Sequence, residues 1–130
     1  MVTNSEYAEK AVALKHSGHN CCQAVTAALA DQNDVSAQTL SQLSAGFCAG
    51  MGNMEATCGA LIGAVMTAGL KTEGVRTLGS AKRISENFKA RCGALSCAEL
   101  KGASTGVVLC PCDDCVRNAV LAYEDVIGIT

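Results

Sequence analysis

Cysteine is the residue type in this sequence most able to do chemistry. Nine of the 130 residues are cysteines: Cys21, Cys22, Cys48, Cys58, Cys92, Cys97, Cys110, Cys112 and Cys115. Thiolates bind soft metal ions and iron–sulfur centres, and pairs of thiols exchange with disulfides. Because an odd number of cysteines cannot pair completely within one chain, a disulfide scaffold is not expected. Metal binding or redox chemistry is indicated instead.

The spacing of three cysteines near the C-terminus favours a metal site. Cys110, Cys112 and Cys115 form the pattern Cys-x-Cys-x-x-Cys, and residues three apart on a helix can share one ligand. The familiar patterns are missing, however. No Cys-x-x-Cys pair recurs as in a zinc ribbon, and there is no closely spaced ferredoxin run. The spacing alone therefore leaves the type of metal open.

Composition excludes several classes of function. Ten basic and twelve acidic residues give a net charge of -2, and there are only two Phe, two Tyr and no Trp. Neither a basic surface nor stacking aromatics for nucleic acid are expected. The longest apolar run, residues 59–70, is too short to span a membrane. The first residues lack the basic start and apolar core of a signal peptide, so we expect a cytoplasmic protein with reduced thiols.

The elements that must position the cysteines are all predicted to be helices. With 49% hydrophobic and 17% charged residues and a single proline, the chain is typical of one globular domain over residues 1–130. Helical spacing of apolar residues predicts an all-α fold, a compact single-domain bundle of about six or seven helices. The expected helices cover about 7–17, 21–31, 37–45, 54–69, 75–90, a short stretch after 96, and 111–127.

Capping patterns place two cysteines at helix starts. Asn20 with Gln23 three residues later predicts a helix that begins at Cys21. Ser96 opens a Ser-x-x-Glu capping box, so Cys97 should be the first residue of the short helix.

Two further cysteines are predicted close to helix starts. Pro111 suits a first helical position, with Cys112 in the opening turn, and Asn53 could cap the helix that carries Cys58 in its second turn. A helix N-terminus offers unpaired N–H groups and partial positive charge, so it should lower the pKa of a thiol. We expect several such termini to converge on one site.

Four segments, in the same order along most of the chain, resemble one protein family. Residues 58–63 match the pattern Cys-Gly-Ala-x-x-Gly. Residues 20–25 are similar to the family's early Asn-Cys-x-Gln-Ala-Val segment, residues 93–100 to its Gly-x-x-x-Cys-x-Glu-Leu segment, and Cys112 with the residues after it to its last cysteine segment. The chain thus resembles the C_GCAxxG_C_C family of redox-active proteins.

The resemblance implies a function and a set of ligands. It implies an α-helical redox protein whose working set is Cys21, Cys58, Cys97 and Cys112. In a related member fused to a cytochrome, the four cysteines look suited to a [2Fe–2S] centre. We therefore expect these four residues to bind an iron–sulfur centre, most simply of the [2Fe–2S] type, in a protein that transfers electrons. No catalytic residues are predicted.

Five cysteines depart from the family pattern: Cys22, Cys48, Cys92, Cys110 and Cys115. They could enlarge or replace the cluster, supply a resolving thiol, or act as small buried hydrophobic residues. Of these, Cys48, Cys110 and Cys115 are candidates to join the metal site. Cys48 and Cys92 lack a capping context, which favours a purely structural role.

Two alternative functions stay open at this point. One is a thiol–disulfide oxidoreductase in which a cysteine pair cycles without metal. The other is a zinc- or copper-binding module, favoured by the Cys-x-Cys-x-x-Cys pattern. Whether the protein is an oxidoreductase or an electron-transfer component is equally open. A redox partner protein of unknown identity is expected, and a homodimer is compatible with the sequence.

Overall fold

The predicted all-α fold is confirmed. The computed structural model describes residues 5–103 and 105–129, and in these ranges there is no β-sheet, only an isolated bridge between Thr57 and Ser96. None of the described helices is long and apolar enough to cross a membrane. The elements are α1 (Glu6–His16), α2 (Cys21–Ala28), the 3-10 turn η1 (Ala30–Gln32), α3 (Ala37–Ser44), the π-type turn η2 (Gly50–Met54), α4 (Gly59–Lys71), α5 (Thr77–Cys92), α6 (Cys97–Lys101) and α7 (Cys112–Ile127).

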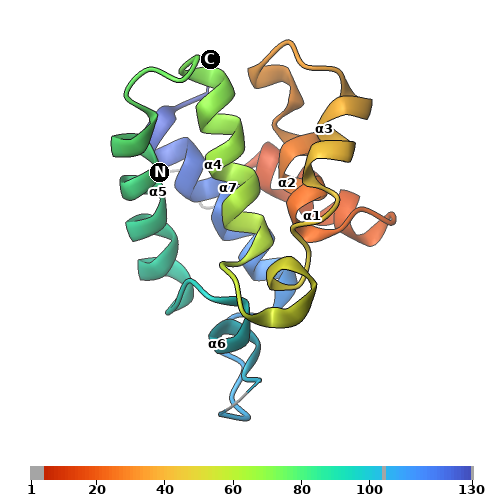
Figure 1. Cartoon of the computed structure of the whole chain (residues 1–130), viewed down its shortest axis with the longest axis vertical. Coiled ribbons are helices and arrows are strands. Elements are labelled where there is room, and N and C mark those ends of the chain that lie inside the picture. The colour runs from red at the N-terminus through yellow and green to blue at the C-terminus, as the bar shows by residue number, and fades with distance from the viewer. Residues whose placement is uncertain (1–4, 104, 130) are drawn as a thin grey trace.

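Helices α4 and α7 form the middle of the molecule. Helix α4 packs against α2, α5 and α7, while α7 also packs against α1 and α5. In Figure 1, α5 lies to one side of this pair, α1, α2 and α3 lie to the other, and the short α6 lies at the bottom. Helix α6 is in contact with the turn η2. This end of the bundle therefore brings together segments that are far apart in the sequence.

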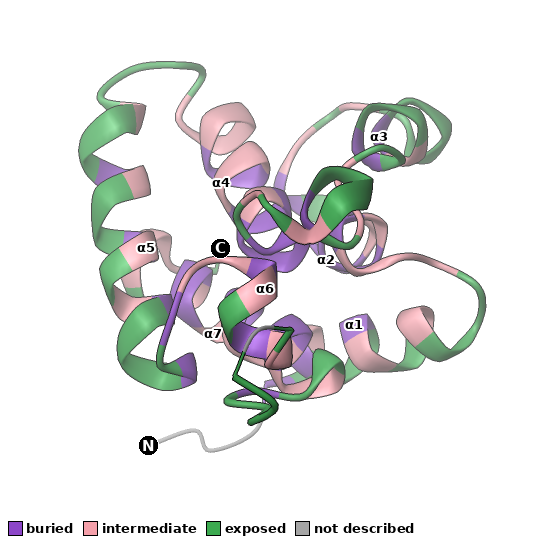
Figure 2. Cartoon of the chain, turned by 60° about the horizontal axis from the view of Figure 1, so that its bottom comes forward, coloured by how far each residue is buried: buried purple, intermediate pink, exposed green. Residues whose placement is uncertain are grey.

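The core lies between the central helices and is built largely from small residues. Figure 2 shows the buried residues gathered where α2, α4 and α7 face one another. The largest fully buried side chains include Tyr123, Phe88 and Ile84. A Cβ at Gly63 of α4 would lie 2.9 Å from the carbonyl oxygen of Cys22. The backbones of α2 and α4 can therefore approach closely only because residue 63 is glycine.

Local capping explains where α2 and α6 begin. The Asn20 side chain accepts a hydrogen bond from the Gln23 N–H, and the Gln23 side chain accepts one from the Asn20 N–H, which completes a capping box. The Ser96 side chain accepts a hydrogen bond from the Glu99 N–H at the start of α6. Both predicted helix starts are confirmed. Helix α7 begins at Cys112 with Pro111 as its N-cap, whereas Pro111 was expected to be the first helical residue.

The predicted start of the fourth helix is wrong. Helix α4 begins at Gly59 with Cys58 as its N-cap, not at Met54 with Cys58 in the second turn. Residues 50–54 instead form η2, in which Met51 has φ 65° and Gly52 has φ 85°. Residues with a left-handed backbone conformation cannot continue a right-handed α-helix. The Asn53 side chain accepts from the Glu55 N–H and so caps a turn.

Candidate metal centre

All four cysteines of the family pattern lie at the start of a helix. Cys21, Cys97 and Cys112 are the first residues of α2, α6 and α7, and Cys58 is the N-cap of α4. All four line one cavity of about 380 Å³. The helix starts therefore converge, so that their partial positive charge and the four thiols share one space.

Two backbone hydrogen bonds hold the start of α4 beside the start of α6. The Cys58 N–H donates to the Leu95 carbonyl at 2.8 Å, and the Cys97 N–H donates to the Ala56 carbonyl at 3.0 Å. These bonds are possible because residues 55–58 are not helical. The late start of α4 thus brings Cys58 and Cys97 close together.

Two glycines let the connector between α3 and α4 lie directly against the cysteines. A Cβ at Gly59 would lie 2.1 Å from the Phe47 carbonyl oxygen and 2.7 Å from the Cys21 sulfur. A Cβ at Gly50 would lie 2.9 Å from the Cys97 Cβ. No side chain larger than hydrogen fits at residue 59 without displacing backbone.

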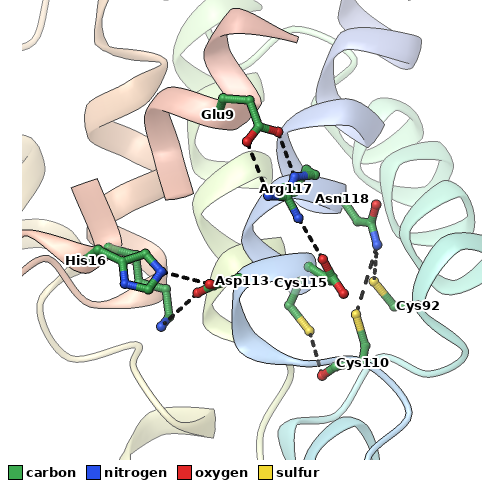
Figure 3. A network of polar contacts seen from close by, with 10 residues as sticks. Glu9, His16, Cys92, Cys110, Asp113, Cys115, Arg117 and Asn118 are labelled. Carbon is green, nitrogen blue, oxygen red and sulfur yellow. Dashed lines mark hydrogen bonds and ion pairs between the residues drawn. The ribbon is translucent and has the colours of Figure 1, made fainter. Parts of the chain in front are cut away.

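Ion pairs between α1 and α7 position Cys112. Asp113, the residue after Cys112, contacts Lys15 Nζ at 3.2 Å and His16 Nε2 at 2.8 Å. Figure 3 shows this contact, and above it the ion pair between Arg117 and Glu9 that joins the same two helices. The Arg117–Glu9 distance is 2.7 Å. The first turns of α7 are therefore held against α1.

The electrostatic setting of the cavity suits a negatively charged group. Lys15 and Lys101 line it, as does His19, and among the described lining residues there is no carboxylate. Lys101 Nζ lies 3.3 Å from the Cys115 sulfur. Burial works against its charged form, but the nearby Cys115 and Cys112 thiols raise the pKa of Lys101 above its ordinary value.

Without a bound metal, three thiols of the cavity, those of Cys21, Cys58 and Cys97, have raised pKa values. Burial, reinforced by the Cys58 and Cys48 thiols, raises the pKa of Cys21 to about 11. Contact with the Cys115 thiol, followed by burial, raises the pKa of Cys58 far above its ordinary value, and burial raises the pKa of Cys97. These directions contradict the expected lowering by helix N-termini, because lost hydration and crowded thiols outweigh the helix. Metal binding must therefore displace protons.

Three of the remaining cysteines form a second group. The sulfurs of Cys92, Cys110 and Cys115 lie within 4.8 Å of one another, and all three residues are buried. Such a group could hold a metal ion. Figure 3 shows Asn118 beside the sulfurs of Cys92 and Cys110, and its side-chain nitrogen lies 3.4 Å from the Cys92 sulfur.

The predicted site residues are thus divided between two places. Cys21, Cys58, Cys97 and Cys112 line the cavity together with Cys48 and Cys115, whereas Cys110 is not among the residues that line it. The Cys-x-Cys-x-x-Cys pattern is split, because Cys112 faces the cavity while Cys110 and Cys115 lie beside Cys92. Whether these residues bind a metal stays a prediction.

The sequence did not single out two polar residues next to the thiols. Asn118 lies three residues after Cys115 on α7, but it contacts the Cys92 and Cys110 sulfurs, which this spacing does not indicate. Lys101 ends α6 and reaches Cys115 only through the tertiary fold, so no local pattern indicates it.

Comparison with known proteins identifies the family. Neither the curated proteins nor the solved structures contain a match to this chain. Residues 19–126 match the family described as "Putative redox-active protein (C_GCAxxG_C_C)". The match covers most of the 130 residues and includes the four cysteines that line the cavity. The chain therefore belongs to the C_GCAxxG_C_C family of redox-active proteins.

Proposed function

We propose that this protein is an electron carrier that binds an iron–sulfur centre, of the [2Fe–2S] type, through Cys21, Cys58, Cys97 and Cys112. One observation carries the proposal: these four cysteines, from four separate segments of the chain, line the same cavity. Four cysteine thiolates are the usual ligand set of such centres.

The residues present fit such a group. Hydrogen bonding to the backbone N–H groups of Cys22 and Ala49 lowers the pKa of Cys21, and that to Ala60 and Leu61 lowers the pKa of Cys58, so these groups partly offset the larger effects that raise both values. Hydrogen bonds of this kind stabilise thiolate ligands and tune the reduction potential. A thiolate-bound iron–sulfur core carries net negative charge, which agrees with the Lys101 ammonium at the cavity, whereas the charge of Lys15 is already paired with Asp113.

The protein supplies ligation, shielding and a point of contact with the surface. When bound, an iron–sulfur centre accepts and releases one electron. Cys58 and Cys97 are 3% and 5% exposed, which keeps water away from that side of the cavity. Cys112 is exposed. We therefore assign the Cys112 edge as the place where electrons pass to and from a redox partner protein.

A dithiol mechanism without metal is less well supported by the same residues. An attacking thiol needs a substantial thiolate fraction near neutral pH. The pKa of Cys21 is instead raised to about 11, and that of Cys58 is raised further. These thiols can bind a metal only by releasing their protons, so metal binding here should strengthen as the pH rises.

The proposal is tested on protein purified without oxygen. Its visible absorption spectrum is recorded, and iron and acid-labile sulfide are assayed on the same sample. A brown protein with iron and sulfide in equal amounts is expected, together with a reversible one-electron reduction. A colourless sample that binds no iron after reconstitution, and that forms a reversible disulfide on mild oxidation, would overturn the proposal in favour of the dithiol mechanism.

Two variants identify the ligands. Cys58→Ser should lose the chromophore and most of the iron. Cys22→Ser is the matched control. Cys22 is buried like Cys58 and directly follows the proposed ligand Cys21, yet it does not line the cavity. It should keep iron and colour. Equal iron content in the two variants would contradict the ligand assignment.

A further inference from the structure

The second cysteine group has the form of a closed site. Cys92 is the last residue of α5, Cys110 precedes α7, and Cys115 lies in the early part of α7. They are 4%, 3% and 0% exposed, respectively. Three sulfurs bound to one ion at a metal–sulfur distance of about 2.3 Å stand about 4 Å apart. The observed separations, all within 4.8 Å, need only a small contraction to reach that geometry.

Hydrogen-bond donors surround these three sulfurs. The Asn118 side-chain NH₂ lies 3.4 Å from the Cys92 sulfur and 4.0 Å from the Cys110 sulfur. The Lys101 ammonium lies 3.3 Å from the Cys115 sulfur and 3.3 Å from the Cys110 carbonyl oxygen. A neutral thiol is a weak acceptor, whereas a metal-bound thiolate is a good one. Each sulfur therefore has a donor within 4.0 Å that would bind it more strongly as a thiolate, and metal binding would replace the bond that the Cys115 thiol donates to the Cys110 carbonyl oxygen.

The number and type of ligands indicate which ion fits. Among the described residues, no fourth cysteine, histidine or carboxylate lies within the same distance of all three sulfurs. Structural zinc sites take four ligands in a tetrahedron. Monovalent copper is soft, selects thiolates and is satisfied by three of them. We propose that Cys92, Cys110 and Cys115 form a buried three-coordinate site for Cu(I), with Asn118 and Lys101 as donors to its sulfurs.

This copper site shares no ligand with the iron–sulfur site proposed above, and the two sites adjoin at Cys115. None of the four proposed iron ligands belongs to it, and Cys92 and Cys110 do not line the cavity. Cys115 lies at the boundary, because it also lines the cavity and contacts the Cys58 thiol. The two proposals can consequently fail independently of each other.

The test uses Cu(I) itself, delivered without oxygen to the full-length protein as purified. Affinity and stoichiometry are measured by competition with a chromogenic Cu(I) chelator, and X-ray absorption counts the sulfur neighbours. The wild type and the control Cys22→Ala should each bind one equivalent of Cu(I) tightly. The double variant Cys92→Ala/Cys110→Ala should lack this tightly bound equivalent. The variant Cys21→Ala/Cys97→Ala, which removes two cavity thiols, should keep this equivalent with three sulfur neighbours.

Asn118→Leu gives a second readout that leaves every thiol in place. Loss of a donor to the bound sulfurs should lower the Cu(I) affinity about tenfold to a hundredfold, with an unchanged circular dichroism spectrum. The proposal is overturned if Cys92→Ala/Cys110→Ala folds and binds Cu(I) like Cys22→Ala. It is also overturned if Asn118→Leu binds Cu(I) as tightly as the wild type, or if the tight equivalent has four ligands.

Discussion

Replacing Gly59 by alanine should open the candidate metal centre, because the added methyl group has no space. A Cβ at this position would lie 2.1 Å from the Phe47 carbonyl oxygen and 3.1 Å from its carbonyl carbon. The obstacle is backbone, which cannot move aside as a flexible side chain could. Ordinary contact begins at 3.4 Å, so the connector and α4 must separate by about 1 Å. The same methyl group would meet the Cys21 sulfur at 2.7 Å.

The size of the effect follows from comparison with a glycine on the same helix. Overpacking of this kind costs about 1–3 kcal/mol. Gly69→Ala is the matched control, since its Cβ would meet only the Thr77 Cγ2 at 3.8 Å, an ordinary contact. Alanine is the better helix former, so Gly69→Ala should gain about 0.5–1 kcal/mol. The free energies of unfolding of the two variants should therefore differ by about 2–4 kcal/mol.

Urea unfolding followed by circular dichroism measures this difference directly. Iron retained after anaerobic purification reports on the cavity, and Gly59→Ala should lose iron while Gly69→Ala keeps it. If Gly59→Ala proves as stable as Gly69→Ala, the connector does not lie against α4 as described, and the packing argument for the site is wrong.

Three further predictions concern the cap, the buried thiols and the surface. Asn20→Ala removes the N-cap acceptor of α2 and should lower the free energy of unfolding by about 1 kcal/mol. Asn20→Asp keeps an acceptor at this position and should retain most of that stability. Iodoacetamide at mildly alkaline pH, with mass spectrometry of the labelled sites, should modify the exposed Cys112 before Cys22, because Cys22 is fully buried and burial raises its pKa to about 12. Labelling of Cys22 as early as Cys112 would contradict the packing of α2. The Arg91 guanidinium lowers the pKa of Asp125, so the pair stabilises the protein above the ordinary carboxyl pKa and that stabilisation is lost as the pH falls through the lowered value. Because the pair is partly exposed, Asp125→Asn should lower the free energy of unfolding in urea by less than about 1 kcal/mol at neutral pH. In acid, the unfolding free energies of the variant and the wild type should become equal. A difference that persists in acid would show that charge is not its cause.

Much of the fold could be predicted because its signals are local. The capping box of Asn20 and Gln23 acts over three residues, as does the Ser96 cap, so the starts of α2 and α6 are readable from the chain. The start of α4 was predicted wrongly for a nonlocal reason. Ala56 and Cys58 are instead hydrogen-bonded to Cys97 and Leu95, and no pattern near residue 58 reveals these bonds.

The four cysteines of the candidate site could be named from the sequence, because each belongs to a motif of the family. Their acid–base behaviour could not be predicted in the same way. A helix N-terminus is a local feature that lowers a thiol pKa. The pKa of Cys21 is raised by burial and by the Cys58 and Cys48 thiols, and that of Cys58 by the Cys115 thiol and burial, and these surroundings exist only in the folded chain.

The sequence by itself determined the helical fold, the family and the thiols that begin helices, because caps, periodicity and motifs act over a few residues. Only the tertiary structure decided how the cysteines are grouped. Cys110, Cys112 and Cys115 are neighbours in the chain, yet Cys112 faces the cavity while the other two lie against Cys92 at the far end of α5. The physical reason is that a side chain's partners depend on which helices pack together, and that packing is set by contacts between residues far apart in the sequence.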